Sequence, residues 1–194
     1  IDERELVLAA GRIGFPVAVK STRRTAGRSA RAGVALDLSS TEEVDEAVAT
    51  MVDALGDGAE TLIVQEMIPP GVDVRIHCHR DERLGVIVNV GYGGVDADLI
   101  GDRTSRLAPL SPASAAAMLG ETKVGGALAA AGLDSSPLVD VIVLAAQLCA
   151  DQHDVDDLDL NPVVVSDGQA IVTDASVRLV DRPDDGDGPI RRLE

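Results

Sequence analysis

Aromatic side chains are nearly missing from this sequence. Phe15 and Tyr92 are the only two among 194 residues and tryptophan is absent, so the core must be built from alanine, valine, leucine and isoleucine. Platforms on which nucleic-acid bases stack are thereby excluded.

Cysteine is scarce too, and Cys78 and Cys149 each lie in an apolar or alternating stretch. A disulfide framework or a cysteine-bound zinc site has no support, and a reducing cytoplasm is the expected location.

Positive charge is also in short supply. Lysine and arginine number 17 against 33 aspartates and glutamates, which gives a net charge of -16. Such a field repels nucleic acid and anionic lipid, so neither is an expected partner.

The longest apolar run, residues 138–150, contains Asp140 and is shorter than the about 20 residues that cross a bilayer. No membrane span is expected, and because the chain opens with Ile1 in a helical pattern, we interpret it as a piece of a longer polypeptide.

What is present is an alternation of short strands and amphipathic helices, which predicts an α/β (α+β) fold. Ser40 and Glu43 have the spacing of a capping box, and the apolar positions after them repeat at three and four residues until Gly56. Ser111-Pro112 and Ser136-Pro137 each place a capping hydroxyl before a proline that starts a helix. Helices are expected at 2–10, 44–55, 115–119 and 138–149, and strands at 15–20, 33–38, 61–66, 74–78, 84–90, 158–165 and 170–174.

The strongest local signal is a hairpin near the C-terminus. Asp167-Gly168 lies between two apolar runs and is typical of a two-residue turn. The resulting register sets Asn161 opposite Asp174 and Asp159 opposite Ser176. Opposed side chains lie about 5 Å apart and residues two apart share a face, so Asp159, Asn161 and Asp174 form one oxygen-rich patch. Carboxylate and amide oxygens suit Mg²⁺, whereas the alternative in so acidic a chain is that these residues oppose one another by chance.

Three other features each allow two interpretations. Lys20 ends a strand before a basic, glycine-bearing loop, and it either neutralises phosphate or belongs to a solvated surface. The glycines of Gly91-Tyr92-Gly93-Gly94 either let a backbone approach phosphate closely or only make a turn. His77 and His79 share a strand face with Asp73, and they either hold a metal or line the wet side of a sheet, which we favour.

Taken in series, several segments resemble a known family. They are GFPVAVKS at 14–21, VQEMIPPGVDV at 64–74, GYGGVDADLIGD at 91–102, RLAPLS at 106–111, LDLNPVVV at 158–165 and VTDASVRL at 172–179. In this order they resemble the ATP-grasp domain of ADP-forming acyl-CoA synthetases and, more distantly, the beta subunit of succinyl-CoA synthetase. The resemblance implies two lobes with the nucleotide site between them: a first lobe at 1–67, incomplete at its N-terminus, a second at 68–181 with a metal-binding hairpin, and a flexible acidic tail at 182–194.

The resemblance also implies roles for individual residues. Lys20 matches the lysine on the nucleotide's phosphates, and Asp73 matches the position near the ribose. Asn161 and Asp174 match the Mg²⁺ ligands, and Asp159 matches an acidic residue that steers a phosphohistidine. The strand that reads adenine is matched by Gln65, Glu66 and Met67, and further motif positions by Gly93, Gly94, Asp98 and Arg106. The expected cofactors are ATP or ADP with Mg²⁺, and the expected catalytic residues are Lys20, Asp159 and Arg106.

The activity that the resemblance implies is ATP- and Mg²⁺-dependent formation of an acyl-CoA through phosphoryl transfer. The implied partners are CoA-binding and ligase domains, in the same or a partner chain, and an acyl or acetyl substrate. The loop after Lys20 departs from the family, because it has Gly27-Arg28-Ser29-Ala30 where the family has a histidine and an aspartate. The alternative is therefore a catalytically degenerate, regulatory ATP-grasp domain of a GNAT-type protein acetyltransferase, which the ending GPIRRLE resembles.

Overall fold

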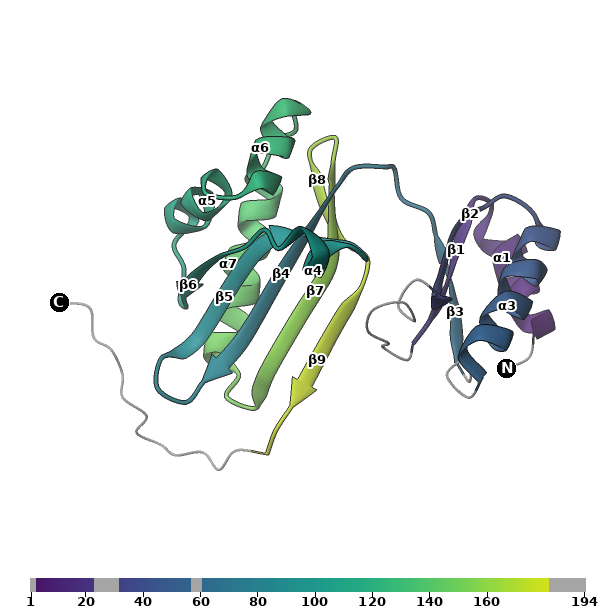
Figure 1. The fold of residues 1–194 in the computed structure, drawn as a ribbon, viewed down its shortest axis with the longest axis horizontal. Helices are drawn as coiled ribbons and strands as arrows, with labels where there is room; N and C mark the ends of the chain where they lie inside the picture. The colour runs from purple at the N-terminus through teal and green to yellow at the C-terminus, as the bar shows by residue number, and fades with distance from the viewer. Residues whose placement is uncertain (1–2, 23–31, 57–60, 182–194) are drawn as a thin grey trace. The chain divides into compact units, whose positions relative to one another are not determined.

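The computed structural model describes residues 3–22, 32–56 and 61–181. The chain divides into two compact units, Ile1–Pro69 and Pro70–Glu194 (Figure 1). Each unit packs helices against an antiparallel sheet, so the mixed helix-and-sheet class predicted from the sequence is confirmed. Within the described residues, none of the helices combines the length and the apolarity that a bilayer crossing requires.

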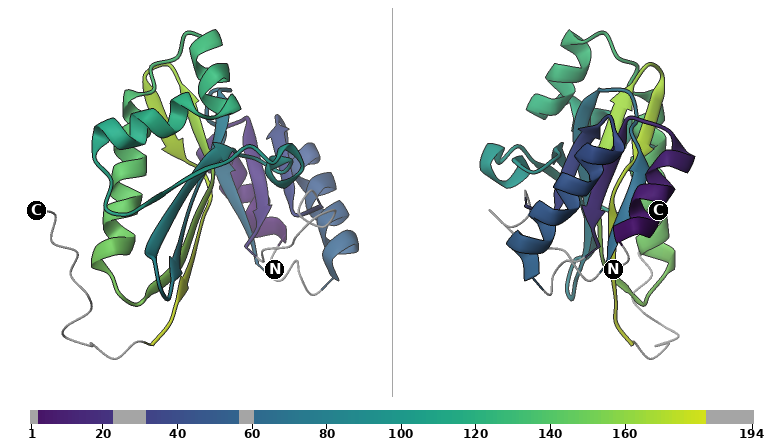
Figure 2. Two further views of the ribbon diagram at one scale, coloured as in Figure 1. Left: turned by 60° about the vertical axis from the view of Figure 1, so that its left-hand side comes forward. Right: turned by 90° about the vertical axis from the view of Figure 1, so that its right-hand side faces the viewer.

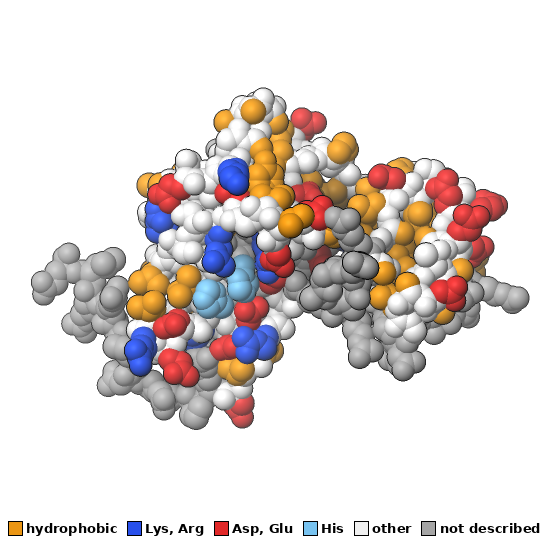
Figure 3. All heavy atoms as spheres, viewed as in Figure 1, with side chains coloured by type: hydrophobic (Ala, Val, Ile, Leu, Met, Phe, Trp, Pro, Cys, Tyr) orange, Lys and Arg blue, Asp and Glu red, His pale blue; other side chains and the backbone are white. Residues whose placement is uncertain are grey.

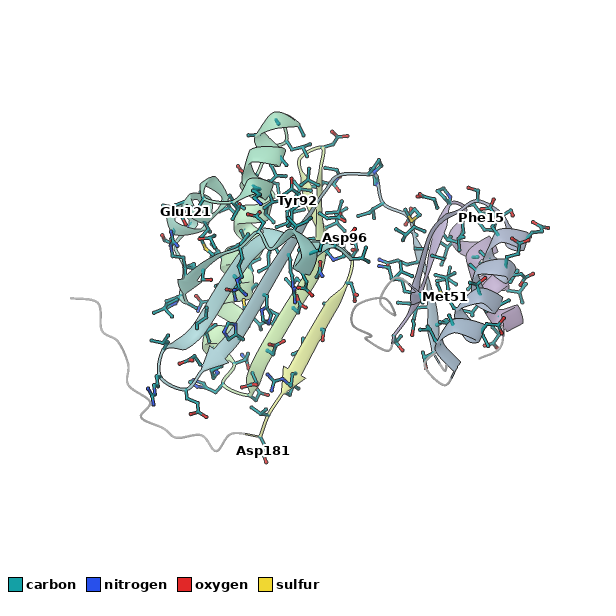
Figure 4. The ribbon with its side chains drawn as sticks, viewed as in Figure 1. Phe15, Met51, Tyr92, Asp96, Glu121 and Asp181 are labelled. Atoms are coloured by element: carbon teal, nitrogen blue, oxygen red, sulfur yellow. The ribbon has the colours of Figure 1, made fainter. Side chains whose placement is uncertain are left out.

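The first unit contains a three-stranded sheet in the order β2-β1-β3. Its strands are β1 (Val17–Ser21), β2 (Val34–Leu38) and β3 (Leu62–Glu66), and its described helices are α1 (Glu3–Ile13) and α3 (Thr41–Leu55). The two helices pack on one face of the sheet, where Met51 of α3 lies in the core (Figure 4). The buried residues of this core are Ala10, Val17, Val19, Val44, Val48, Met51 and Leu62.

The ends of the two helices show how local signals act. Ser40 Oγ accepts a hydrogen bond from the Glu43 N–H at 3.2 Å, and the Glu43 carboxylate accepts from the Ser39 N–H at 2.7 Å. The capping box is thus present, except that the Glu43 carboxylate binds the N–H of Ser39, the residue before the cap, instead of the N–H of Ser40. Gly56 ends α3 as predicted. The predicted end of α1 at Gly11 is wrong, because the helix continues to Ile13; one glycine costs about 1 kcal/mol, which packing against the sheet offsets.

The second unit contains a six-stranded sheet in the order β6-β5-β4-β7-β8, with β9 also paired to β7. The strands are β4 (Val72–Asp81), β5 (Gly85–Tyr92), β6 (Thr104–Leu107), β7 (Val155–Ser166), β8 (Gln169–Val172) and β9 (Ala175–Leu179). One edge of the long strand β7 is shared, since residues 163–166 pair with β8 and residues 155–160 pair with β9. The other edge of β7 pairs with β4.

Three helices cover one face of this sheet, and the other face is largely open (Figures 1 and 2). The covering helices are α5 (Pro112–Gly120), α6 (Lys123–Ala130) and α7 (Ser136–Asp151), while the short α4 (Ala97–Ile100) lies on the open side. Alternate residues of β4, β5 and β7 enter a core with Met118, Leu128, Leu138 and Ile142, in which the free thiols Cys78 and Cys149 are also buried. The polar residues that alternate with them, such as Arg75, His77, Asn89 and Asp159, therefore lie on the open face.

The helix starts in this unit were predicted with mixed success. Ser111 caps α5 through its hydroxyl as predicted. The predicted cap at Ser136 is wrong, because Ser136 is already helical and its N–H donates to Asp134 Oδ1 at 2.9 Å. Helix α6 was not predicted, although Thr122 Oγ1 caps it by accepting from the Gly125 N–H at 3.2 Å. The two consecutive glycines within α6 conceal its helical pattern in the sequence.

Candidate functional site

The candidate nucleotide residues of the first unit lie on β1 and β3. Strand alternation places Lys20, together with Ala18 two residues earlier, on the sheet face opposite the helices. Gln65 pairs with Ala18 and therefore lies on the same face. Glu66 is the next residue along β3 and belongs to the other face, at an exposed position. The Met67 N–H donates to the carbonyl of Pro16 at 3.3 Å. The fold therefore brings Lys20 and Gln65 to one surface of this unit.

Two predicted features lie outside the described residues. The loop after Lys20 includes Arg23, Arg24, Arg28 and Arg31, together with the Gly27-Arg28-Ser29-Ala30 segment that departs from the family, and residues 23–31 are not described. The acidic tail at 182–194 and its ending GPIRRLE also lie outside the described residues.

In the second unit, Gly93 and Gly94 follow β5 and pack tightly against β4. The Gly93 N–H donates to the Asp73 carbonyl at 2.9 Å, and a Cβ on Gly93 would lie 2.6 Å from the carbonyl carbon of Val74. Gly94 has a φ of +80°, and a Cβ there would lie 2.9 Å from Asp73 Oδ2. Gly93 is required because the β4 backbone lies too close for a Cβ, and Gly94 is required because side chains rarely adopt its positive φ. Burial raises the pKa of the Asp73 carboxyl at this turn.

Asn161 of β7 binds the same glycine turn. Its Oδ1 accepts from the Gly94 N–H at 2.7 Å, and its Nδ2 donates to the Gly94 carbonyl at 3.4 Å. The backbone N–H of Asn161 donates to the carbonyl of Asp174 at 3.1 Å. The structure thus brings together three predicted positions, Asp73, Gly94 and Asn161, with the exposed Asp174 bonded to the backbone beside them.

The hairpin register predicted from Asp167-Gly168 is confirmed. Strand β7 pairs with β8 and then with β9 in the predicted register, and Asp159 pairs with Ser176 of β9. The pairing of β7 with β4 becomes irregular around Pro162, which has no N–H to donate. This irregularity lets Asp159 face the open side of the sheet while Val163, four residues later, faces the core.

Asp159 forms a salt bridge with Arg75, which the sequence interpretation did not include. Its side chain is only 6% exposed, and its Oδ1 and Oδ2 accept from Arg75 Nε at 2.8 Å and Arg75 Nη2 at 3.0 Å. The hydrogen bonds to Asp159 raise the pKa of the Arg75 guanidinium. Arg75 Nη1 also donates to Asp98 Oδ1 at 2.8 Å. The guanidinium of Arg75 therefore places a fixed positive charge at the Asp159 end of the predicted oxygen-rich patch.

The histidines lie beside this arginine on the open face, where Figure 3 shows pale blue imidazoles among arginine and aspartate side chains. His77 Nε2 lies 2.9 Å from Asp157 Oδ2, and its ring stacks on that of His79 with centroids 5.2 Å apart. His79 Nδ1 lies 3.3 Å from the amide nitrogen of Asn89. In the part of the chain that the structure describes, no three His, Cys, Asp or Glu side chains are grouped as metal ligands.

A hollow of about 390 Å³ opens on this face of the second unit. Tyr92, at the end of β5 next to α4, borders it (Figure 4). The polar side chains that line the hollow come from the adjacent strands β4 and β5, from α4 and from the loop after α4, and they include Arg75, His77, Asn89, Asp98 and Arg103. The hollow is therefore a polar depression rather than an apolar pocket.

Arg106 lies on the opposite, helix-covered face. It pairs with the core residue Val88 on β5, and its guanidinium binds the carboxylate of Glu121 at the end of α5 (Figure 4). Hydrogen bonds from Thr104 and Arg106 lower the pKa of Glu121. The structure does not bring Arg106 together with Asp159, which faces the open side of the same sheet.

The donor chemistry of Asn161 and Asp174 fits a magnesium ion. Magnesium prefers oxygen ligands and is commonly bound through one or two carboxylates, with water and substrate phosphates completing its coordination. Asp174 is exposed and supplies such a carboxylate. The amide oxygen of Asn161 accepts one hydrogen bond from Gly94, and an amide oxygen has two lone pairs. The residues present are thus compatible with the metal that the family resemblance implies.

Arg75 is the residue of this face that sequence reasoning missed as a functional candidate. The alternation in residues 73–79 indicates that Arg75 faces the polar side, but it does not indicate its partner. That partner, Asp159, is 84 residues away in the chain. The pairing of β4 with β7 brings the two together, and no short-range turn signal specifies that pairing.

Comparison with known proteins identifies the family. The model of the ATP-grasp domain matches residues 1–179. The beta subunit of acetate–CoA ligase (ADP-forming) I from Pyrococcus furiosus is 28% identical over 188 residues, which cover 92% of this chain and 81% of that subunit. Acetate–CoA ligase (ADP-forming) II from Archaeoglobus fulgidus is 30% identical over 185 residues, which cover 93% of this chain but only 27% of that protein. No acetyltransferase is among these matches, so the GNAT interpretation gains no support.

Solved structures agree with this assignment. The dinucleotide-forming acetyl-coenzyme A synthetase 1 of Ca. Korarchaeum cryptofilum, in complex with coenzyme A and Ca-AMPCP, matches with a TM-score of 0.79 and 31% identity over 92% of this chain and 82% of that one. A second structure of that synthetase contains coenzyme A and Mg-AMPPCP and matches with a TM-score of 0.73, 31% identity, and coverage of 91% of this chain and 82% of that one. The chain belongs to the ATP-grasp domain family and is homologous to ADP-forming acyl-CoA synthetases.

Proposed function

We propose that this chain binds ATP or ADP with Mg²⁺ as the nucleotide-binding part of an ADP-forming acyl-CoA synthetase. The family match over residues 1–179 supports this proposal. The observation that carries it is the junction of β7 with the segment before β9, where Asn161 is hydrogen-bonded both to Gly94 and to the backbone of Asp174. This junction presents an amide and a carboxylate, the donor types that a nucleotide-bound metal ion needs.

Residues of both units have roles in this proposal. Lys20 neutralises charge on the nucleotide's phosphates, and the strand at 65–67 (Gln65, Glu66 and Met67) offers backbone groups to adenine. Asp73 accepts hydrogen bonds from the ribose, and Gly93 and Gly94 hold the turn that supports it. Because these groups position the nucleotide and offset its charge, their contribution to phosphoryl transfer is electrostatic.

Asn161 and Asp174 would hold the magnesium ion. When bound, the metal ion neutralises phosphate charge that accumulates during phosphoryl transfer. Asn161 is held in place by Gly94, which fixes the direction of its amide group before a ligand arrives. Asp174 is exposed and only its backbone is bonded to Asn161, so its carboxylate is open to solvent-borne cations.

The proposal includes CoA-binding and ligase domains as partners and an acyl or acetyl group as the substrate. The chain covers 81% of a relative that is a beta subunit, but 27% of a relative that carries the ligase activity in one longer protein. On this proposal the remaining steps, acyl transfer and thioester formation, are carried out by those other domains. Asp159 faces the same open surface as Asn161 and would meet the segment that carries the phosphoryl group.

Titration calorimetry with MgADP and MgATP tests the proposal. Asp174→Ala should weaken binding by about tenfold or more, since it removes a metal ligand without disturbing a buried contact. Asn161→Ala should have a similar effect, with the added loss of the Gly94 contacts. Asp140→Ala removes an equally exposed carboxylate from the helix layer and should leave the affinity unchanged.

Metal removal provides the second arm of this experiment. With EDTA present, ADP binding should weaken in the unaltered protein, and Asp174→Ala should then differ little from it. Absence of binding heat with either nucleotide in the folded protein, or equal affinities for the unaltered protein and Asp174→Ala in Mg²⁺, would contradict the proposed function.

A further inference from the structure

Arg75 lies on the open face, and the buried carboxylate of Asp159 fixes the orientation of its guanidinium. Its Nε and Nη2 donate to the two oxygens of Asp159 at 2.8 and 3.0 Å, and the Asp159 side chain is only 6% exposed. A bidentate pair of this kind holds the planar guanidinium in one orientation. Arg75 itself remains 28% exposed, so part of the group reaches the surface.

The outer contact of Arg75 is of a different kind. Its Nη1 donates to Asp98 Oδ1 at 2.8 Å, but the Asp98 side chain is 93% exposed. An exposed ion pair contributes little, because water solvates the separated charges almost equally well. Asp98 is therefore an exchangeable partner, whereas Asp159 is a fixed one.

The hydrogen-bonding capacity of Arg75 exceeds what these two carboxylates use. A guanidinium has five N–H donors, and Nε, Nη1 and Nη2 each make one contact here among the described residues. The guanidinium borders the hollow of about 390 Å³, which Arg103 also lines. Arg103 is exposed and adds a second positive charge to the same depression.

We propose that Arg75, held by Asp159, binds a phosphoryl group in this hollow and exchanges Asp98 for it. The proposal rests on the proposed function, because it assigns a binding residue for the phosphate chemistry of an ATP-grasp domain. The planar fork of an arginine matches the oxygen geometry of phosphate and carries the complementary charge. A metal ion or a cationic side chain is disfavoured there, since Arg75 neutralises the buried Asp159, and the Asp102 carboxylate that also lines the hollow already accepts from the Lys123 and Val124 N–H groups.

The phosphoryl group has two possible sources with the same chemistry. It is either the terminal phosphate of a nucleotide or a small free species such as inorganic phosphate or an acyl phosphate. The volume of the hollow accommodates the small species, and the polar side chains that line it, His77 and Asn89 among them, suit a hydrated anion.

The sharpest test removes the competing carboxylate. Asp98→Asn retains the size of the side chain and alters an exposed site, so folding is not at risk. If a phosphoryl group replaces Asp98, this variant should bind inorganic phosphate and acetyl phosphate about two- to fivefold more tightly, the scale of one exposed ion pair. Asp140→Asn is the matched control, because it removes the same charge from the helix-covered side and should leave binding unchanged.

Calorimetry with each phosphate, in the presence and absence of MgADP, measures these affinities. Arg75→Lys should weaken binding by about fivefold or more, since it keeps the charge and loses the fork. Tighter binding of both small phosphates by Asp98→Asn supports a free phosphate species as the ligand. Tighter binding of MgATP but not of MgADP, with no effect on the small phosphates, supports the terminal phosphate of the nucleotide.

Equal affinities of Asp98→Asn and the unaltered protein for both small phosphates and for MgATP would overturn the proposal. The same titrations report on the proposed function separately, through the heat of MgADP binding. If MgADP binds normally and Asp98→Asn changes nothing, the assignment of Arg75 fails while the nucleotide-binding function stands.

Discussion

Replacing Arg75 by methionine should destabilise the second unit strongly. The substitution leaves the Asp159 carboxylate, with 6% of its side chain exposed, without its cation. Breaking a buried pair from one side costs about 3–5 kcal/mol, because a buried charge remains uncompensated. Asp159→Leu should cost less, since the Arg75 left behind is 28% exposed and still contacts Asp98.

The double variant Arg75→Met/Asp159→Leu distinguishes this reasoning from a simple loss of packing. Replacing both members of a buried pair by apolar residues is often neutral, so the double variant should be more stable than Arg75→Met alone. The coupling energy in the double-mutant cycle should be about 2–3 kcal/mol, near the upper limit for residues in direct contact.

Urea unfolding followed by tyrosine fluorescence provides the assay. Tyr92 is the only tyrosine and the chain lacks tryptophan, so the signal comes from the second unit alone. A cost below about 1 kcal/mol for Arg75→Met, or additive effects in the cycle, would refute the argument that Asp159 needs a compensating cation.

Three further predictions concern other parts of the fold. Because burial raises the pKa of Asp73, the folded state holds its proton more tightly, and stability falls as pH rises from about 3.9 through the raised value. Asp73→Asn should therefore raise the melting temperature at pH 7 and lose this advantage near pH 3; an equal difference at both pH values would contradict the assignment. Gly93→Ala should destabilise by about 1–3 kcal/mol or more in urea unfolding, since its Cβ would lie 2.6 Å from backbone carbon of Val74, whereas Gly126→Ala, with nothing within 4 Å, should be neutral or stabilising. Ser40→Ala should lower the stability of the first unit by about 1 kcal/mol through loss of the cap on α3, measured by far-ultraviolet circular dichroism, and an unchanged midpoint would show that the cap is dispensable.

Short-range chemistry accounts for what the sequence could predict. The turn at Asp167-Gly168 specifies the pairing of residues close to it, and counting outward from that turn placed Asp159 opposite Ser176 correctly. The caps at Ser40 and Ser111 were likewise readable, because a hydroxyl and the amide it binds are only three residues apart.

Long-range pairing accounts for what the sequence could not predict. The partner of Asp159 is set by the alignment of β4 with β7, and Arg75 could equally have faced water on an unpaired strand. The same limit applies to Arg106, whose motif gave no indication that it lies on the helix-covered face beside Glu121. Contacts between distant segments depend on the whole sheet, which no single motif encodes.

Because β7 shares one edge between β8 and β9, the number of residues between its two halves cannot change. One inserted residue between Asp159 and Val163 would turn one half of the strand over, moving the core valines to the open face or the Asp159 carboxylate into the apolar core. An insertion at Asp167-Gly168 would only lengthen an exposed turn. A peptide tag or fluorescent reporter belongs at that turn, where it would leave the open face of the sheet intact.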